Sequence, residues 1–161
     1  MLNILVVCTG NSCRSIMLEG LLNHYGKDYF QAYSAGSNPA GYVHPMSIKT
    51  LEKAGITLSN YKSQSWDEFS GINFDLVITV CDNAAGETCP VYLSSAPKLH
   101  WGVEDPAKFQ GSEKEIENEF QRIFSILAKR THAMIEIYKE EKSINPQSLE
   151  KLKGSFYMSL V

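Results

Sequence analysis

The chain has 161 residues, of which 43% are hydrophobic and 20% charged, and its net charge is −3. This composition is typical of a globular protein, and it excludes a disordered chain, a membrane-spanning segment and a broad basic surface for nucleic acid or an anionic bilayer. We therefore expect one monomeric domain over residues 1–161. Because the chain has no broad basic surface, an anionic ligand would have to be held by groups arranged at one site.

Apolar runs alternate with helical patterns along the chain, starting from a buried strand near the N-terminus. The strands are expected over residues 3–8, Phe30–Ala35, Phe74–Val80 and Ala96–Trp101. The helices are expected over residues 15–25, Met46–Ala54, Ser112 to about Lys139, and Gln147–Lys153. Ser112, with Glu115 three residues later, forms a capping box that marks the start of the long helix.

Strands that alternate with helices favour parallel pairing through right-handed crossovers. The expected fold is therefore of the α/β class, a three-layer doubly wound sandwich around a four-stranded parallel sheet. Ligands bind such sheets at the carboxyl ends of the strands, which directs attention to the turn after the first strand.

Four cysteines lie at positions 8, 13, 81 and 89, and the apolar start Met1–Val7 lacks the basic region and cleavage site of a signal peptide. These features favour the cytoplasm, where thiols are kept reduced. In that compartment, paired cysteines are more often catalytic or metal-binding than structural.

The turn after the first strand has the composition of an oxyanion-binding loop. It reads Cys8-Thr9-Gly10-Asn11-Ser12-Cys13-Arg14-Ser15. Successive backbone N–H groups of such a loop can point at one tetrahedral oxyanion, and the N-terminus of the following helix adds partial positive charge. Arg14 offers a planar fork that grips two oxygens. We expect residues 8–14 to bind the oxyanion.

Cys8 is the candidate nucleophile of this loop. The same donors should hold it as a thiolate, and Ser15 is placed to add a hydroxyl hydrogen bond to its sulfur. Gly10 is expected to supply backbone geometry closed to other residues, and Cys13 is expected to fill space. The alternative is that Cys8 is an ordinary buried thiol and Arg14 a surface residue.

The segment Cys8–Ser15 resembles the active-site loop that low-molecular-weight tyrosine phosphatases share with thioredoxin-coupled arsenate reductases. The similarity extends to the segments Ser34–Gly36, Val43–Pro45, Ser63–Asp67, His100–Gly102 and Asp105–Ala107. The run Val80–Glu87, followed by Cys89 and Pro90, is typical of the reductases. The resemblance implies the low-molecular-weight phosphatase fold and an arsenate or phosphate-like substrate. Some reductases of the family bind potassium beside the loop through residues that match Asn11, Glu19 and Ser34, but Gln64 stands where a further acidic partner is expected. We therefore expect no bound cofactor or metal.

In both enzyme classes, the cysteine attacks the central atom of the oxyanion and an oxygen leaves. The resemblance also implies that Asp105 is the general acid that protonates this leaving oxygen. A solvated turn aspartate is the alternative for this residue. Phosphatases of the family generally carry an aromatic residue next to the proline of this element, where this chain has Ala107. A small side chain there suits a bare inorganic oxyanion better than an aryl ester.

Arsenate reduction needs two electrons, and a single thiol cannot supply them and return to its starting state. The expected relay runs from Cys8 to Cys81 to Cys89, and an external dithiol then reduces the final disulfide. Parallel strands bring their carboxyl ends together, so Cys81 can approach the Cys8 loop. If residues 81–89 were helical, their ends would be roughly 12 Å apart, so this segment must be looped or unwind to form a disulfide.

The resemblance implies thioredoxin as the external reductant. Seven residues separate Cys81 from Cys89, one more than in one subgroup of the reductases, and this keeps glutathione with glutaredoxin as an alternative. Two further alternatives for these thiols are buried core cysteines and a zinc site with His100, which lacks the tight Cys-x2-Cys spacing.

The sequence therefore predicts a cytoplasmic arsenate reductase that acts through Cys8, Arg14 and Asp105, and then through Cys81 and Cys89. The enzymatic alternative is a low-molecular-weight tyrosine phosphatase. The other alternative is a non-catalytic redox or metalloid sensor, against which a general acid argues because mere binding does not need one.

Overall fold

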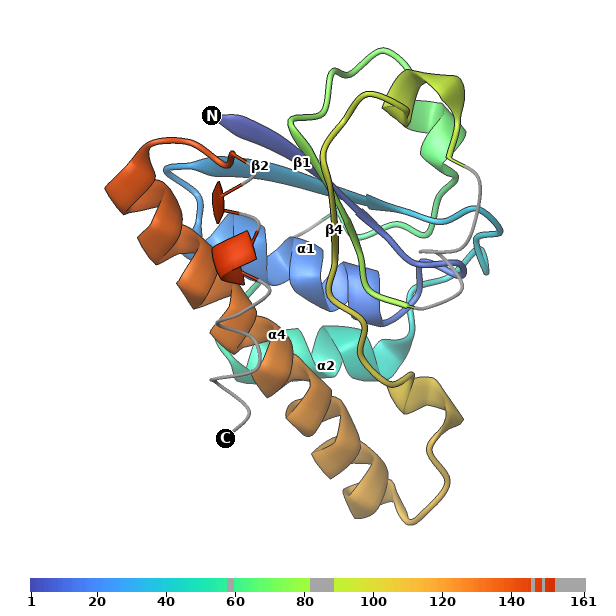
Figure 1. Ribbon diagram of the computed structural model, residues 1–161. Coiled ribbons are helices and arrows are strands. Elements are labelled where there is room, and N and C mark those ends of the chain that lie inside the picture. The colour runs from blue at the N-terminus through green and yellow to red at the C-terminus, as the bar shows by residue number, and fades with distance from the viewer. Residues whose placement is uncertain (58–59, 82–88, 146, 149, 153–161) are drawn as a thin grey trace.

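The computed structural model describes residues 1–57, 60–81, 89–145, 147–148 and 150–152. Its centre is a sheet of four parallel strands in the order β2-β1-β3-β4 (Figure 1). The strands are β1 (Leu2–Val7), β2 (Phe30–Ala35), β3 (Leu76–Thr79) and β4 (Lys98–His100). The predicted four-stranded parallel sheet is confirmed.

The two central strands are buried on both faces, as parallel strands usually are. In β1 the residues Ile4–Val7 are buried, and every residue of β3 is buried. The register runs from Ile4 opposite Leu76 to Val7 opposite Thr79. This register brings the carboxyl ends of β1 and β3 to the same edge of the sheet.

Three helices cover one face of the sheet, on the lower side in Figure 1. They are α1 (Arg14–Tyr25), α2 (Pro45–Lys53) and α4 (Glu113–Glu141), and each contacts the other two. Phe30 of β2 packs against Tyr138 of α4, with ring centroids 5.5 Å apart. At the start of α4 the predicted capping box is present, because Ser112 Oγ accepts from Glu115 N and Glu115 Oε1 accepts from Ser112 N.

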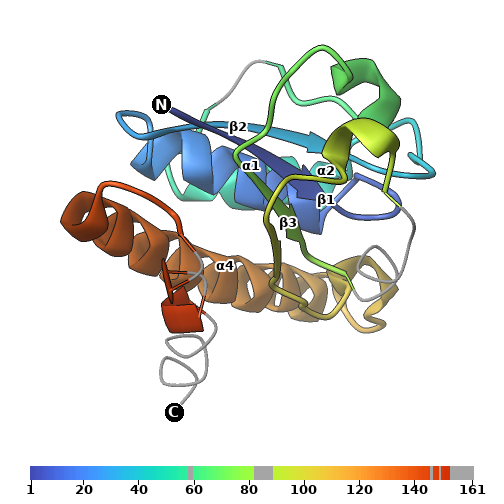
Figure 2. The ribbon, with the colours of Figure 1, turned by 45° about the horizontal axis from the view of Figure 1, so that its top comes forward.

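The opposite face is covered by short 3-10 turns, η1 (Trp66–Phe69) and η2 (Val91–Leu93), as Figures 1 and 2 show. Tyr33 of β2 packs there against Phe69 and Phe74, with ring centroids 5.3 Å and 5.6 Å apart. A third turn, η3 (Pro106–Lys108), lies between β4 and α4. The predicted three-layer α/β fold is therefore confirmed.

The C-terminal helix expected over Gln147–Lys153 is only partly within the described residues. Residues 147, 148 and 150–152 are helical, whereas 149 and 153 lie outside the described part of the chain. None of the helices in the described ranges is long and apolar enough to span a bilayer.

Candidate active site

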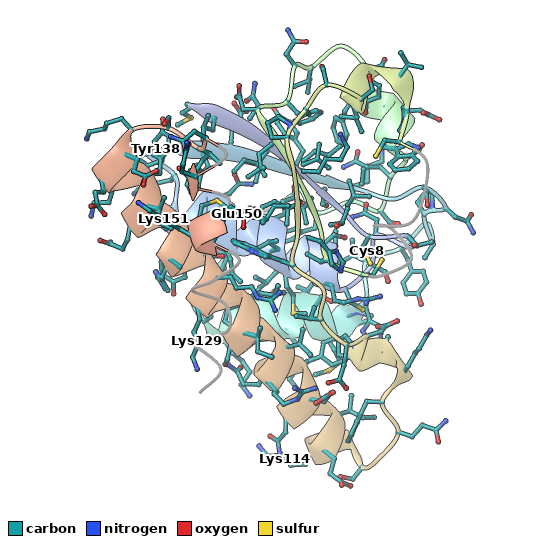
Figure 3. The ribbon with its side chains drawn as sticks, viewed as in Figure 1. Cys8, Lys114, Lys129, Tyr138, Glu150 and Lys151 are labelled. Atoms are coloured by element: carbon teal, nitrogen blue, oxygen red, sulfur yellow. The ribbon has the colours of Figure 1, made fainter. Side chains whose placement is uncertain are left out.

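The oxyanion loop lies between the end of β1 and the start of α1, at the carboxyl edge of the sheet, where Figure 3 labels Cys8. Cys8 extends the pairing of the strands, because its N–H donates to the Ala35 carbonyl at 3.2 Å. Helix α1 begins at Arg14, so its N-terminus closes the loop.

The carbonyl groups of this loop bond outward to the surrounding chain. Three of them accept backbone N–H groups: Thr9 O from Asn38 (3.0 Å), Gly10 O from Ala40 (2.8 Å) and Ser12 O from His44 (3.0 Å). In a trans peptide the C=O and the following N–H point in opposite directions. The N–H groups of residues 10, 11 and 13 are therefore directed inward, as oxyanion binding requires.

Asn11, and not Gly10, supplies the unusual backbone geometry of the loop. Asn11 has a φ of 48°, whereas Gly10 is not among the glycines with positive φ, and a Cβ there would meet only Ser12 Oγ at 4.0 Å. The expectation for Gly10 is thus wrong. Asparagine tolerates the left-handed region because its side chain can bond nearby groups.

The Asn11 side chain is fully buried and ties the loop to its neighbours. Its Nδ2 donates to Ser15 Oγ at 2.8 Å and to Ser34 Oγ at 3.0 Å, and its Oδ1 accepts from Gln64 N at 2.8 Å. Ser34 in turn donates to Glu19 Oε1 at 2.5 Å, and burial raises the pKa of Glu19 to about 7. This buried network fixes the loop. From the sequence, Glu19 and Ser34 were indicated only as matches to the potassium-binding positions of some family members, not as supports of the loop.

Gly36 at the end of β2 allows the loop to pack closely. A Cβ at this position would lie 2.4 Å from Thr9 O and 2.8 Å from Cys8 O, closer than any side chain permits. The segment Ser34–Gly36 therefore matters for the shape of the site as well as for the sheet.

The structure places Cys81 beside Cys8, as the parallel topology predicts. Both thiols are buried, with 5% and 4% of their surface exposed. Thr9 N donates to Cys81 Sγ at 3.4 Å, so the second thiol occupies one of the loop's amide donors.

The electrostatics of Cys8 differ from the sequence-based expectation. A hydrogen bond with Cys81 and burial raise the pKa of the Cys8 thiol well above its usual range, although the nearby Arg14 guanidinium lowers it. The arrangement with Cys81 over the loop therefore favours protonated Cys8. The sequence-based expectation counted the loop donors without the neighbouring thiol.

Arg14 and Asp105 face each other across the site. Arg14 Nη1 donates to Val103 O at 3.0 Å, and Nη2 lies 3.6 Å from Asp105 Oδ2. Asp105 caps the start of η3, where its Oδ1 accepts from Ala107 N at 3.0 Å. Both side chains are partly exposed, so they can reach a bound oxyanion.

These groups surround a cavity of about 630 Å³. Its lining consists of Thr9, Gly10, Arg14, Cys81, Val103, Glu104, Asp105, Lys108, Phe109 and Glu119. The thiol in this lining is that of Cys81, which contacts Cys8, and it lies with the Arg14 guanidinium and the Asp105 carboxylate. A guanidinium and a carboxylate beside the Cys8 loop suit attack by Cys8 on a tetrahedral oxyanion with proton transfer to the leaving oxygen.

Cys8, Cys13 and Cys89 are not among the residues of this lining. Cys89 is half-buried at the start of the segment leading to η2, and residues 82–88, which connect it to Cys81, lie outside the described part of the chain. Cys13 is buried, with Ser12 Oγ 3.8 Å from its sulfur, and burial raises its pKa. Within the described ranges, no three His, Cys, Asp or Glu side chains come together as a metal site.

Residues 3–144 match the family described as low molecular weight phosphotyrosine protein phosphatase. The chain belongs to this family. The arsenate reductase of Bacillus subtilis is 42% identical over 117 residues, which are 73% of this chain and 83% of that protein. The arsenate reductase of Halalkalibacterium halodurans is 38% identical over 130 residues, 81% of this chain and 92% of that one.

Solved members of the low-molecular-weight phosphatase family share the fold. A structure described as an arsenate reductase in the phosphate binding state has a TM-score of 0.70 and 28% identity, covering 84% of this chain and 98% of that one. A low-molecular-weight protein tyrosine phosphatase from T. tengcongensis has a TM-score of 0.71 and covers 84% of this chain and 99% of that one. At 24% identity, the latter supports the fold alone.

Proposed function

We propose that this protein reduces arsenate to arsenite. The observation that carries the proposal is the second thiol, Cys81, hydrogen-bonded to Cys8 and to the loop amide of Thr9. Hydrolysis of a phosphoester needs only the first thiol, whereas a reduction needs a second one within reach of it. The relatives named arsenate reductase support the same choice.

In the first step Cys8 attacks the arsenic atom. Entry of the oxyanion moves Cys81 off the Thr9 amide, and Arg14 with the loop N–H groups then holds the arsenate oxygens and favours the Cys8 thiolate. The Cys8 thiol gives its proton to an oxygen of the arsenate dianion as it attacks. A sulfur–arsenic bond forms and an arsenic–oxygen bond breaks. Asp105 gives its proton to the departing oxygen, which leaves as water.

In the second step the Cys81 thiolate attacks Cys8 Sγ. The sulfur–arsenic bond breaks and its electron pair stays on arsenic, which falls from the +5 to the +3 state and leaves as arsenite. The two thiols lose two electrons in total and form the Cys8–Cys81 disulfide.

In the third step Cys89 attacks Cys81 Sγ and releases Cys8 as a thiolate, so the disulfide moves to Cys81 and Cys89. Cys89 is half-buried, and it is therefore nearer to an external reductant than Cys8. We propose thioredoxin as this reductant. Support comes from a structural neighbour described as a thioredoxin-dependent arsenate reductase, with a TM-score of 0.56 and 26% identity, covering 82% of this chain and 62% of that one. Glutathione with glutaredoxin is the other candidate.

The test is arsenate-dependent NADPH consumption, first with thioredoxin and thioredoxin reductase, and then with glutathione, glutaredoxin and glutathione reductase. We expect turnover in the first system and loss of it in Cys8→Ser. Cys89→Ser should stop after one arsenite per enzyme with Cys8 and Cys81 joined, whereas Cys13→Ser, the matched control, should turn over normally. Continued turnover of Cys89→Ser would remove Cys89 from the relay.

Phosphatase activity is the second candidate function, because the family match and the Cys8, Arg14 and Asp105 geometry are equally suited to a phosphoester. The protonated Cys8 beside Cys81 and the small Ala107 disfavour an aryl ester. We expect slow hydrolysis of aryl phosphates at best. Hydrolysis without arsenite formation would make the phosphatase the correct assignment, and oxyanion binding without either reaction would support the sensor alternative.

A further inference from the structure

The segment Trp101–Asp105, here called the acid loop, connects β4 to η3 and carries the general acid. Arginine side chains hold it at successive residues. Arg130 of α4 contacts its start, Arg14 contacts Val103 and Asp105, and Arg122 of α4 contacts Glu104. The loop has no regular secondary structure, so its position depends on the bonds made to its backbone. Arg130 and Arg14 bond to its carbonyl groups, whereas Arg122 reaches only the exposed Glu104 side chain.

Arg130 is the most buried of the three arginines, with 3% of its surface exposed. Its Nη1 donates to the Trp101 carbonyl at 2.7 Å, and its Nη2 donates to the Gly102 carbonyl at 3.4 Å. A planar guanidinium that bonds two consecutive carbonyls fixes the direction of both peptide planes, which one lysine ammonium cannot do. Burial lowers the pKa of Arg130 to about 10, so it stays charged at neutral pH.

The orientation set by Arg130 passes to the site through the next residue. Val103 N donates to Val80 O at 3.1 Å, beside Cys81, and Val103 O accepts from Arg14 Nη1. Two residues further on, Asp105 faces Arg14. Arg130 itself lies outside the set of residues that line the cavity, so its effect on the reaction passes through the acid loop.

We propose that Arg130 is a positioning residue for the reduction, which holds the acid loop so that Asp105 faces the Cys8 loop. The inference rests on the proposed function, because it assumes that Asp105 donates the proton in the first step. A displacement of about 1 Å at a reacting group can cost about a hundredfold in rate. Arg130 therefore controls the rate of the step more than the binding of the oxyanion.

The test is single-turnover arsenite formation by the fully reduced enzyme, mixed with arsenate without any external reductant. We expect Arg130→Met to lower the rate at saturating arsenate about tenfold or more, and to change the half-saturating arsenate concentration less than about threefold. Arg130→Lys, which keeps the charge and one donor, should recover part of the rate and serves if the methionine variant folds poorly. Arg122→Met is the control, because Arg122 also contacts the acid loop but is 46% exposed.

A double-mutant cycle with Asp105→Asn separates positioning from general damage. Arg130→Met should cost less than about twofold in the Asp105→Asn background, since the proton donor is already gone. Equal losses in both backgrounds, or a loss in Arg122→Met as large as in Arg130→Met, would overturn the inference and leave the proposed function intact. If Asp105→Asn costs nothing, the acid assigned in the proposed function is wrong, and the inference about Arg130 falls with it.

Discussion

Replacement of Cys81 by alanine should make Cys8 easier to ionise. The hydrogen bond with Cys81 is the largest cause that raises the pKa of Cys8, and burial is the next. Removing a group that raises a pKa lowers it. Because Arg14 still lowers the pKa of Cys8 in the variant, the midpoint of Cys8 ionisation should move to lower pH.

The size of this change follows from the contact that is lost. A hydrogen bond to a charged group contributes about 1.5–3 kcal/mol, which corresponds to about 1–2 pKa units. Below its pKa, the alkylation rate of a thiol grows with the thiolate fraction. Each thiolate becomes less nucleophilic as its pKa falls, with a Brønsted coefficient of about 0.4–0.5. The net acceleration in Cys81→Ala should therefore be about 3- to 15-fold.

The assay is iodoacetamide alkylation of Cys8 as a function of pH, with the Cys8 peptide quantified by mass spectrometry. The midpoint of the profile reports the pKa, while the plateau at high pH reports access to the sulfur, so the two effects of removing a side chain are separated. Cys13→Ala is the matched control, because this buried thiol of the same loop is not among the causes of the Cys8 shift. An unchanged or higher midpoint in Cys81→Ala would refute the reasoning.

Three other predictions follow from the packing of the described residues. Gly36→Ala should weaken binding of inorganic phosphate by tenfold or more, measured by calorimetry, because the new Cβ would lie 2.4 Å from Thr9 O; Gly71→Ala, which meets nothing within 4 Å, should bind normally. The pKa of Glu19 is raised to about 7, so its contribution to stability is present below pH 4.5 and is lost as pH rises through 7. Glutamine cannot ionise and keeps this contribution. In urea unfolding between pH 5 and 8, the free energy of unfolding of Glu19→Gln should therefore rise by about 3 kcal/mol relative to the unsubstituted protein. Ser112→Ala should lower the free energy of unfolding by about 1 kcal/mol at the start of α4, and an equal midpoint in urea would contradict this.

The parts of the fold that could be predicted are those whose signal is local. The strands β1 and β3 form continuous apolar runs because they are buried on both faces, and the start of α4 carries its capping box within four residues. Strand β4 is shorter than the expected Ala96–Trp101. The residues on either side of β4 still bond to the neighbouring segment, because Val77 N donates to Pro97 O at 2.9 Å and Trp101 N donates to Thr79 O at 2.7 Å. The 3-10 turns η1 and η2 have no periodic pattern by which they could be recognised.

In the candidate site, too, features with a local signal could be predicted and features that depend on distant residues could not. The oxyanion loop is contiguous, and its residue types indicate its chemistry directly. The role of Asn11 depends on Ser34 and Gln64, which are distant in sequence, so only the folded chain shows that asparagine carries the left-handed backbone. The raised pKa of Cys8 depends in the same way on Cys81, 73 positions along the chain.

Arg130 had a signal that sequence analysis did not use. It follows Leu127 by three residues and precedes Met134 by four, and both of these apolar residues are fully buried. At that spacing an arginine lies on the apolar side of the helix. A charged side chain there must find partners inside the protein, and the carbonyls of the acid loop are the partners that the fold provides.

The position of Cys81 imposes an order on the proposed reaction. Its sulfur bonds the Thr9 amide and the Cys8 side chain, so it occupies one amide donor of the loop and covers the nucleophile. While it remains there, Cys8 stays protonated and is a poor nucleophile for stray electrophiles and oxidants. Arsenate must displace Cys81 before Cys8 can attack, and the displaced thiol stays next to the new sulfur–arsenic bond that it then breaks. One residue thus protects the nucleophile before the substrate arrives and reduces the adduct afterwards, and this requires no separate domain movement between the first two steps.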